Sequence, residues 1–198
     1  MKKHDALLSL LALLLCLSTV YQAHSQAATD TPVNHELGLR LYGLSDFNLI
    51  YKKQSAPGKF KRYRFGLADF NYTAIDENKN FNLNLGLAVG NERRREIAEK
   101  LYFLHGTEII GGFGLSDQRS NNFDTQQFRF SLELGIVLGF QYSFSERFYT
   151  SLEVIPSVGV TYTSVSDPSP DQFQLGGGFN SNAVALSLVY CFSTKKKY

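Results

Sequence analysis

The feature that most constrains the fold of this chain is a two-residue alternation of apolar and polar side chains that recurs along most of its length. Every second position in 81–89, 128–142 and 152–162 is apolar, with Pro156 among them, and mostly small or polar residues stand between. Successive side chains of a β-strand point to opposite faces, so this spacing gathers the apolar groups on one face. The sequence therefore predicts an all-β chain of amphipathic strands.

The length of the alternating segments separates a membrane barrel from a soluble sandwich. Strands of globular proteins usually run about 5–6 residues, whereas a tilted membrane-spanning strand needs ~9–11. The alternation here lasts ten to fifteen residues per segment, and Phe and Tyr stand at the ends of the apolar face. Outer-membrane barrels present apolar residues to lipid, polar residues to the lumen and aromatic girdles at both interfaces. We therefore expect an antiparallel transmembrane β-barrel.

The connections predict eight strands with both chain ends on the periplasmic side. Periplasmic turns are expected at 54–59, 97–100 and 145–147, and external loops at 44–46, 76–80, 116–125 and 165–171. A break in the alternation near Ala68–Asp69 indicates a β-bulge. The expected strands are 35–43, 46–53, 60–75, 80–96, 100–115, 126–144, 148–164 and 174–192.

The first residues predict export. Lys2 and Lys3 precede an apolar run over 6–21, and the small residues Ala23 and Ser25 follow, which is the layout of a secretory signal peptide cleaved before Gln26. The run is shorter than the ~20 residues of a spanning helix, which disfavours a membrane anchor. The expected organisation is a signal peptide over 1–25, a periplasmic segment over 26–34, an outer-membrane barrel over 35–192 and a polar tail over 193–198.

Charge and cysteine content bear on whether the chain binds nucleic acid or forms a disulfide. Cleavage removes Lys2, Lys3 and Asp5 from the 20 basic and 18 acidic residues, which leaves 18 and 17. This near-neutral balance gives no reason to expect nucleic acid as a partner. Cys16 leaves with the signal peptide, in which Leu15 before it disfavours a lipoprotein, so Cys191 remains without a disulfide partner.

Charged residues in phase with the polar face are expected inside the barrel. An eight-stranded barrel is only wide enough for side chains to fill, and a buried charge is costly unless it is paired. We therefore expect an ion-pair network that plugs the lumen, in which Glu108, Glu133 and Glu153 pair with Arg64 and Arg129. The alternative is a narrow polar conduit or a ligand pocket. The inward charges are Glu36, Arg40, Arg62, Arg64, Glu92, Arg94, Glu108, Arg129, Glu133 and Glu153.

Catalytic, metal and cofactor motifs are not expected in this sequence. His35 and His105 are the histidines of the mature chain, and His105 shares the phase of the lipid-facing Phe103 and Ile109. No Ser or Cys nucleophile is recognisably tied to either histidine, so a lipid-modifying enzyme ranks third among the functions considered. His, Cys and carboxylates show no metal-ligand spacing, and the Gly runs at 111–114 and 176–178 precede no helix that would make a phosphate loop.

Arg93, Arg94 and Arg95 form the basic run of the barrel, with Lys100 close by. These residues stand near an expected periplasmic turn. Long cationic side chains at such a position can extend to lipid phosphates. We expect them to anchor the barrel to headgroups of outer-membrane lipids.

Several short motifs carry a resemblance to a known family. They are Gly38-Leu39-Arg40, the run Asp-Phe-Asn-Leu-Ile-Tyr-Lys-Lys over 46–53, Arg62-Tyr63-Arg64, and the turns at 98–100 and 145–148. In this order they resemble small outer-membrane β-barrel proteins common in the Bacteroidota, the PorT-like or "outer membrane protein beta-barrel domain" group. The resemblance covers essentially the whole mature chain. It implies a barrel in the outer membrane, with secretion or transport assistance as one role, and it implies no reaction.

The last strand carries a second resemblance. Leu186, Leu188, Tyr190 and Phe192 are similar to the C-terminal signal that the barrel-assembly machinery reads during biogenesis. Here Phe192 is followed by the tail 193–198, whose lysines are expected to be solvated or, in the alternative, to bind anionic headgroups.

These observations predict a barrel in the outer membrane of a Gram-negative bacterium with a structural or interaction role, which presents polar external loops. The alternative is a PorT-like secretion or transport accessory, or a narrow pore. The expected partners are outer-membrane lipids, the barrel-assembly machinery and, for the accessory role, a secretion or envelope protein. No cofactor is expected.

Overall fold

The computed structural model describes residues 33–42, 46–75, 78–120, 123–166, 170–179 and 184–194. The predicted signal peptide, residues 26–32 of the predicted periplasmic segment and tail residues 195–198 lie outside the described residues. So do parts of the four expected external loops. Within the described ranges, no helix is both long enough and apolar enough to cross a membrane.

The described chain is all-β and antiparallel, as predicted. Its strands are β1 Val33–Tyr42, β2 Asp46–Ala56, β3 Lys59–Ile75, β4 Asn78–Ala98, β5 Leu101–Ser120, β6 Phe123–Ser143, β7 Phe148–Val154, β8 Ser157–Val165, β9 Gln172–Gly178 and β10 Val184–Thr194.

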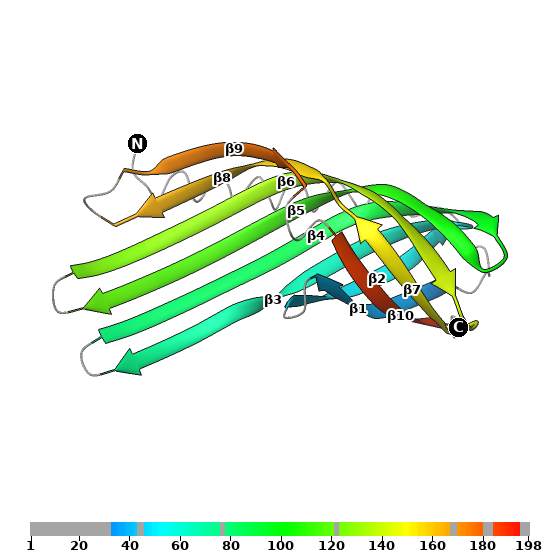
Figure 1. Ribbon diagram of the computed structural model, residues 1–198, viewed down its shortest axis with the longest axis horizontal. Helices are drawn as coiled ribbons and strands as arrows, with labels where there is room; N and C mark the ends of the chain where they lie inside the picture. The colour runs from blue at the N-terminus through cyan, green and yellow to red at the C-terminus, as the bar shows by residue number, and fades with distance from the viewer. Residues whose placement is uncertain are drawn as a thin grey trace. The chain divides into compact units, whose positions relative to one another are not determined.

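The sheet closes into a ring. Each of β1 to β6 pairs with the next strand along the chain, β6 pairs with β7, β7 with β10, and β10 with β1 (Figure 1). Closure leaves the strand edges within this ring paired on both sides, which is the arrangement that distinguishes a barrel from a sandwich. We call this part the ring: β1, β2, 59–66, 86–98, 101–112, 136–143, β7 and β10.

Two of the expected strands are each split, so the described residues form ten strand segments where eight strands were expected. The expected strand 148–164 becomes β7 and β8, which pair with successive parts of β6. Pro156 stands at the break, where it has no N–H to donate to the ladder. The expected strand 174–192 becomes β9 and β10, which pair with β8 and β7.

The long strands continue beyond the ring as a second region. There β3, β4, β5, β6, β8 and β9 pair in that order, without β1, β2, β7 or β10 (Figure 1). We call this region the open sheet: 69–75, 78–84, 114–120, 123–135, 157–165 and 172–178. The predicted loop 116–125 is wrong in this respect, because β5 extends to Ser120 and β6 begins at Phe123. Backbone pairing between these two strands continues despite their polar side chains.

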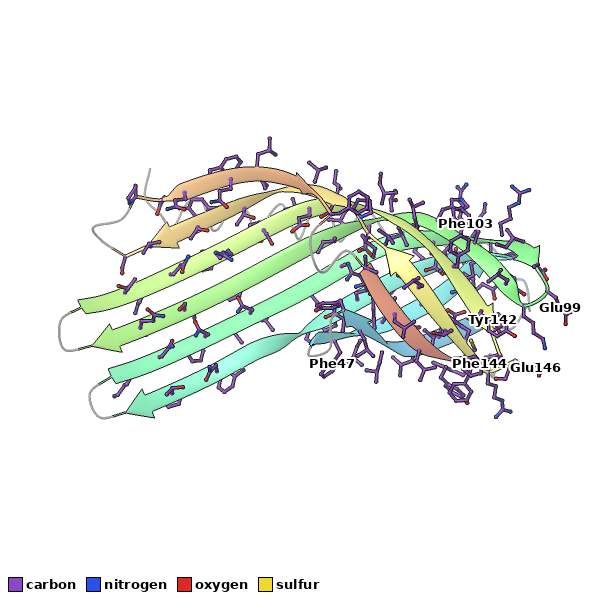
Figure 2. The ribbon with its side chains drawn as sticks, viewed as in Figure 1. Phe47, Glu99, Phe103, Tyr142, Phe144 and Glu146 are labelled. Carbon is purple, nitrogen blue, oxygen red and sulfur yellow. The ribbon has the colours of Figure 1, made fainter. Side chains whose placement is uncertain are left out.

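The turns and the bulge follow the predictions. The turn at Pro57–Gly58 places Gly58 at a φ of 66°, which glycine adopts without strain, and Arg94 N donates to Gly58 O over 2.9 Å. Glu99 and Glu146 mark the other two turns at the same end (Figure 2). The register of β3 against β4 shifts between Gly66 and Asp69, which is the predicted bulge.

The ring reverses the usual pattern of burial. On β1, Leu37, Leu39 and Leu41 are each nearly half exposed, whereas Glu36 and Arg40 are buried. The other strands of the ring also turn apolar side chains outward, and most turn polar or charged ones inward. Buried apolar residues are interspersed among these, such as Leu104 on β5 and Val137 on β6, and Ile50, Tyr149 and Val189 form a small cluster. The interior of the ring is therefore largely polar, and the site lies there.

Candidate functional site

The charged side chains inside the ring come from six of its strands. β1 supplies Glu36 and Arg40, β2 supplies Lys52, β3 supplies Arg62 and Arg64, β4 supplies Glu92 and Arg94, β5 supplies Glu108 and β7 supplies Glu153. Strand alternation turns all of them inward while their neighbours in sequence face outward. We call these nine residues the lumen network.

The centre of the lumen network is an alternating group of two bases and two acids, all fully buried. Arg62 donates to Glu92 over 3.0 Å and to Glu153 over 2.7 Å. Lys52 Nζ lies 2.7 Å from a Glu92 carboxylate oxygen and 3.5 Å from one of Glu153. Each charge therefore has two partners of opposite sign, which offsets the cost of removing it from water.

At the turn end of the ring, Arg94 holds two glutamates together. Its terminal nitrogens donate to both oxygens of Glu36 over 2.8 and 2.6 Å, and its Nε donates to Glu92 over 2.8 Å. The Tyr149 hydroxyl donates to Glu36 over 2.7 Å. The guanidinium also lies 3.8 Å from the centroid of the Phe60 ring, in cation–π geometry. A two-pronged arginine contact of this kind fixes orientation as well as charge.

Toward the open sheet, the network contains an incompletely neutralised base. Arg64 pairs with Glu108, which also lies 3.3 Å from Arg62 Nε. Arg40 has an ion pair with Glu153 at 3.7 Å, and its Nε and Nη2 are buried without a hydrogen-bond acceptor. The nine residues comprise five bases and four acids, so the network contains one more base than acids.

Glycines opposite the glutamates make room for the network. Glu108 lies opposite Gly90 on β4 and Gly135 on β6, and Glu153 lies opposite Gly139. A Cβ on Gly139 would stand 3.1 Å from Glu153 Cα and 3.2 Å from its Cγ. The glycines of the inward face therefore provide the space that these longer side chains occupy.

The structure brings together eight of the ten predicted inward charges: Glu36, Arg40, Arg62, Arg64, Glu92, Arg94, Glu108 and Glu153. It does not bring in Arg129 or Glu133, so the expected pairing of these two residues is wrong. They lie four residues apart on one face of β6, a separation of about 13 Å along a strand. Arg129 is exposed, and Glu133 accepts a hydrogen bond from the Ser157 hydroxyl over 2.6 Å.

Lys52 and Tyr149 are the members of this site that sequence reasoning missed. Lys52 shares the inward phase of Asn48 and alternates with the outward Leu49 and Tyr51. Ile50 is also inward and buried, so both faces of β2 contain an apolar residue and the polarity contrast is weak there. Tyr149 was missed for a different reason: a tyrosine near a strand end is also what the outward aromatic girdle of a barrel contains.

Aromatic rings form a continuous band on the outward face at the turn end. His35 stacks between Tyr51 and Phe192 at centroid distances of 5.9 and 5.5 Å, and its Nδ1 lies 2.6 Å from the Tyr51 hydroxyl. Figure 2 shows Phe103, Tyr142 and Phe144 near the same turns, with Phe47 at the far side of the ring. The aromatic band consists of Tyr63, Tyr51, His35, Phe192, Tyr190, Phe148 and Phe144.

The other residues that the sequence pointed to lie within the strands of the ring. The ring of His105 stacks on Phe103 at 5.8 Å, and Cys191 is half-buried against the apolar cluster of Ile50, Tyr149 and Val189. Leu186, Leu188, Tyr190 and Phe192 all face outward on β10. Their reading by the assembly machinery stays a prediction. In the part of the chain that the structure describes, no three His, Cys, Asp or Glu side chains are grouped as a metal site.

Comparisons with known proteins give structural similarities alone. No protein-family model matches the chain, and no curated protein matches it. The fold is similar to a major outer membrane protein from Thermus thermophilus, with a TM-score of 0.47 and 12% identity over 81% of this chain and 99% of that one. It is also similar to Ail, the attachment invasion locus protein of Yersinia pestis, with a TM-score of 0.41 and 15% identity over 81% and 95% of the two chains. Acinetobacter baumannii CarO gives a TM-score of 0.38 and 11% identity over 83% and 100%. At these values the similarities assign neither a family nor an activity to this chain.

Proposed function

We propose that this chain is an outer-membrane β-barrel that crosses the bilayer as eight strands, with a plugged lumen and a structural or interaction role. The observation that carries the proposal is the closed ring with apolar side chains outside and neutralised charges inside. A soluble protein with this arrangement would expose far more contiguous apolar surface than water tolerates. In a bilayer, the same apolar surface contacts the lipid acyl chains.

The apolar outward face is continuous across neighbouring strands, which supports the membrane assignment. Leu186 and Leu188 on β10 continue the exposed leucines of β1, and Leu152 on β7 continues them further. The aromatic band then borders this apolar face at the turn end. Tyrosine and phenylalanine at that boundary match the girdle that transmembrane barrels place at the lipid headgroups.

The inward face supports a plug. Lys52, Arg62, Glu92 and Glu153 fill the centre of the ring and have no exposed surface. Each of these charges is engaged by others across the interior, so a conducting pathway would have to separate ion pairs. The proposal assigns no reaction, because the four network carboxylates are all committed to cationic partners.

The orientation follows from the chain ends. Val33 at the start of β1 lies opposite Thr194 at the end of β10, so both described ends stand on the side of the short turns. Short turns of outer-membrane barrels lie on the periplasmic side, so we infer that the open sheet lies on the external side and presents its polar inward face to partners or solvent.

Cell fractionation tests the location. The protein should be recovered with the outer membrane and should migrate differently on a gel before and after boiling, since a closed barrel resists detergent until heated. Recovery as a soluble periplasmic protein after detergent-free lysis would refute the membrane assignment. A stable partner cross-linked in cells would define the interaction role, and a secretion component among such partners would favour the PorT-like accessory role.

One observation favours a narrow conduit as the second candidate. Arg40 is buried, its ion pair with Glu153 spans 3.7 Å, and its Nε and Nη2 have no hydrogen-bond acceptor. A base with spare donors of this kind is what an anion-conducting constriction would contain. Recordings from purified barrels in planar bilayers separate the candidates. The plug predicts no steady current, whereas a stable anion-selective current that falls when Arg40 becomes Gln would move the conduit to first place.

A further inference from the structure

The outward face of the ring carries a group of bases just beyond the aromatic band. Lys53 on β2, Lys59 and Lys61 on β3, and Arg93 and Arg95 on β4 all face outward at the turn end. We call these five residues the turn-end basic patch. Arg94, which was expected to reach lipid headgroups together with Arg93 and Arg95, turns inward instead and belongs to the lumen network.

The register sets bases directly opposite one another. Lys53 lies opposite Lys61, and Lys59 lies opposite Arg93. Like charges in directly opposed positions of a sheet destabilise the pairing. On the neighbouring strands, Lys61 is followed by Asn91 and then Thr107, and Arg93 is followed by His105. No acidic residue therefore stands beside these bases in the sheet register.

Four residues of the patch lack the neutralisation found inside the ring. The side chains of Lys53, Lys59, Arg93 and Arg95 form no ion pair with any residue in the described ranges, whereas every base of the lumen network has a carboxylate partner. The same strands therefore neutralise their inward bases with protein carboxylates and leave these outward bases for a counter-ion from outside the described chain.

The position of the patch determines what can supply that counter-ion. Tyr51 and Tyr63 of the aromatic band stand two residues from Lys53 and Lys61 on the apolar side, and His35 lies opposite Lys53. Aromatic rings of this kind sit at the depth of the headgroups. The patch is thus at phosphate depth, directly below an apolar wall along which acyl chains can lie.

We propose that the turn-end basic patch binds the headgroup of an anionic glycerophospholipid in the leaflet at the turn end. The inference rests on the membrane insertion proposed above and adds a defined lipid partner. Phosphate oxygens accept from Lys59 and Arg93 across the β3–β4 pair, and the aliphatic stems of these side chains lie against the apolar wall. An acidic protein segment would match the charge but not the apolar surface that begins two residues away.

The test compares two double variants of the folded barrel in neutral detergent. Lys59→Gln with Arg93→Gln removes two charges of the patch, and Lys79→Gln with Arg129→Gln removes two exposed charges of the open sheet. Each barrel is titrated with a short-chain phosphatidylglycerol, with the matching phosphatidylcholine and with inorganic phosphate. A basic side chain near an anionic lipid surface contributes about 1 kcal/mol, or roughly fivefold in affinity, so the patch variant should bind phosphatidylglycerol on the order of 30-fold more weakly. The open-sheet variant should bind it like the wild type, and phosphatidylcholine and inorganic phosphate should bind weakly to all three.

Unchanged phosphatidylglycerol affinity in the patch variant would overturn the proposal, as would equal binding of inorganic phosphate, which would indicate a free-anion site. The exchange Lys59→Arg with Arg93→Lys keeps both charges and should retain binding, which shows that charge rather than folding is being measured. Heat-modified gel mobility reports folding of every variant. A barrel that inserts but shows no headgroup preference fails this inference alone, whereas a chain that does not insert fails the proposed function.

Discussion

The ring and the open sheet share the strands β3 to β6 but differ in what happens to their inward side chains. In the ring, inward charges such as Arg62 and Glu153 are fully buried and neutralised. In the open sheet, inward residues such as Arg129, Asn84 and Gln174 are exposed. The alternation of faces is the same in both regions. Closure, rather than alternation, therefore decides whether an inward charge must find a partner.

The composition of the two inward faces follows this difference. The ring combines glutamates and arginines with glycines, because paired long side chains need space opposite them. The open sheet carries amides and hydroxyls, which water satisfies without counter-ions. Its inward residues include Asn71, Thr73, Asn82, Asn84, Gln118, Gln127, Ser131, Thr161 and Gln174.

The largest difference between the regions should appear when an inward arginine is removed. Arg62→Gln leaves Glu92, Glu108 and Glu153 short of a partner in the closed ring, and breaking a buried ion pair in this way typically costs ~3–5 kcal/mol. Arg129→Gln in the open sheet should leave the unfolding midpoint unchanged. Equilibrium urea unfolding in lipid vesicles measures both, and similar midpoints for the two variants would remove the distinction between the regions.

The outward face should be sensitive to charge at bilayer depth. Ile136→Arg places a cation on the apolar face of β6, where it should destabilise the barrel by roughly 2–4 kcal/mol if the site lies near the bilayer midplane. Ser131→Thr on the inward face of the same strand should have little effect. The same vesicle unfolding assay applies. Equal tolerance at the two positions would mean that β6 does not present Ile136 to lipid.

A pair of glycine substitutions tests the packing of the ring directly. Gly139→Ala brings a Cβ into steric conflict with Leu152 O and to 3.1 Å from Glu153 Cα on β7, and overpacking of this kind typically costs ~1–3 kcal/mol. Gly176→Ala in the open sheet meets nothing within 4 Å and should be neutral or slightly stabilising. Thermal unfolding in detergent compares the two variants. If Gly139→Ala is as stable as Gly176→Ala, the inward face of the ring is less tightly filled than described.

The smallest effect is expected at Glu133. Because its partner is the Ser157 hydroxyl, Glu133→Gln keeps an acceptor in place and should cost less than ~1 kcal/mol. Exchanging the charges of Glu133 and Arg129 should restore nothing, since the two side chains do not meet. Recovery of stability in the exchanged variant would instead support the pairing that the sequence predicted.

The sequence predicted the strand faces, the turns, the bulge and eight of the nine members of the lumen network. It could do so because, in a strand, alternate residues point to opposite faces. It did not predict the end of the ring. The alternation in the sequence shows that Arg129 is on the inward face of β6. It does not show whether other strands enclose that face at the position of Arg129, and β1, β2, β7 and β10 end before reaching it.

Pairing partners were predicted less well than faces. Of the three glutamates expected to pair with Arg64 and Arg129, Glu108 does pair with Arg64. Glu153 instead contacts Arg62, Lys52 and Arg40. Partners are set by the stagger of strands around the ring, and residues such as Arg62 and Glu153 stand 91 positions apart in the chain. A slip of two residues in one strand keeps every face and changes every partner.

A double-mutant cycle between Arg62 and Glu153 tests the central claim most directly. The free energy of unfolding in vesicles is measured for Arg62→Gln, for Glu153→Gln and for the two together, with a second cycle on Arg129 and Glu133 as the control. A neutralised plug predicts that the two ring substitutions are far from additive, with a coupling of about 0.5–3 kcal/mol, and that the control cycle is additive. Additive losses at Arg62 and Glu153 would contradict the account, because they would show that these two buried charges do not depend on each other.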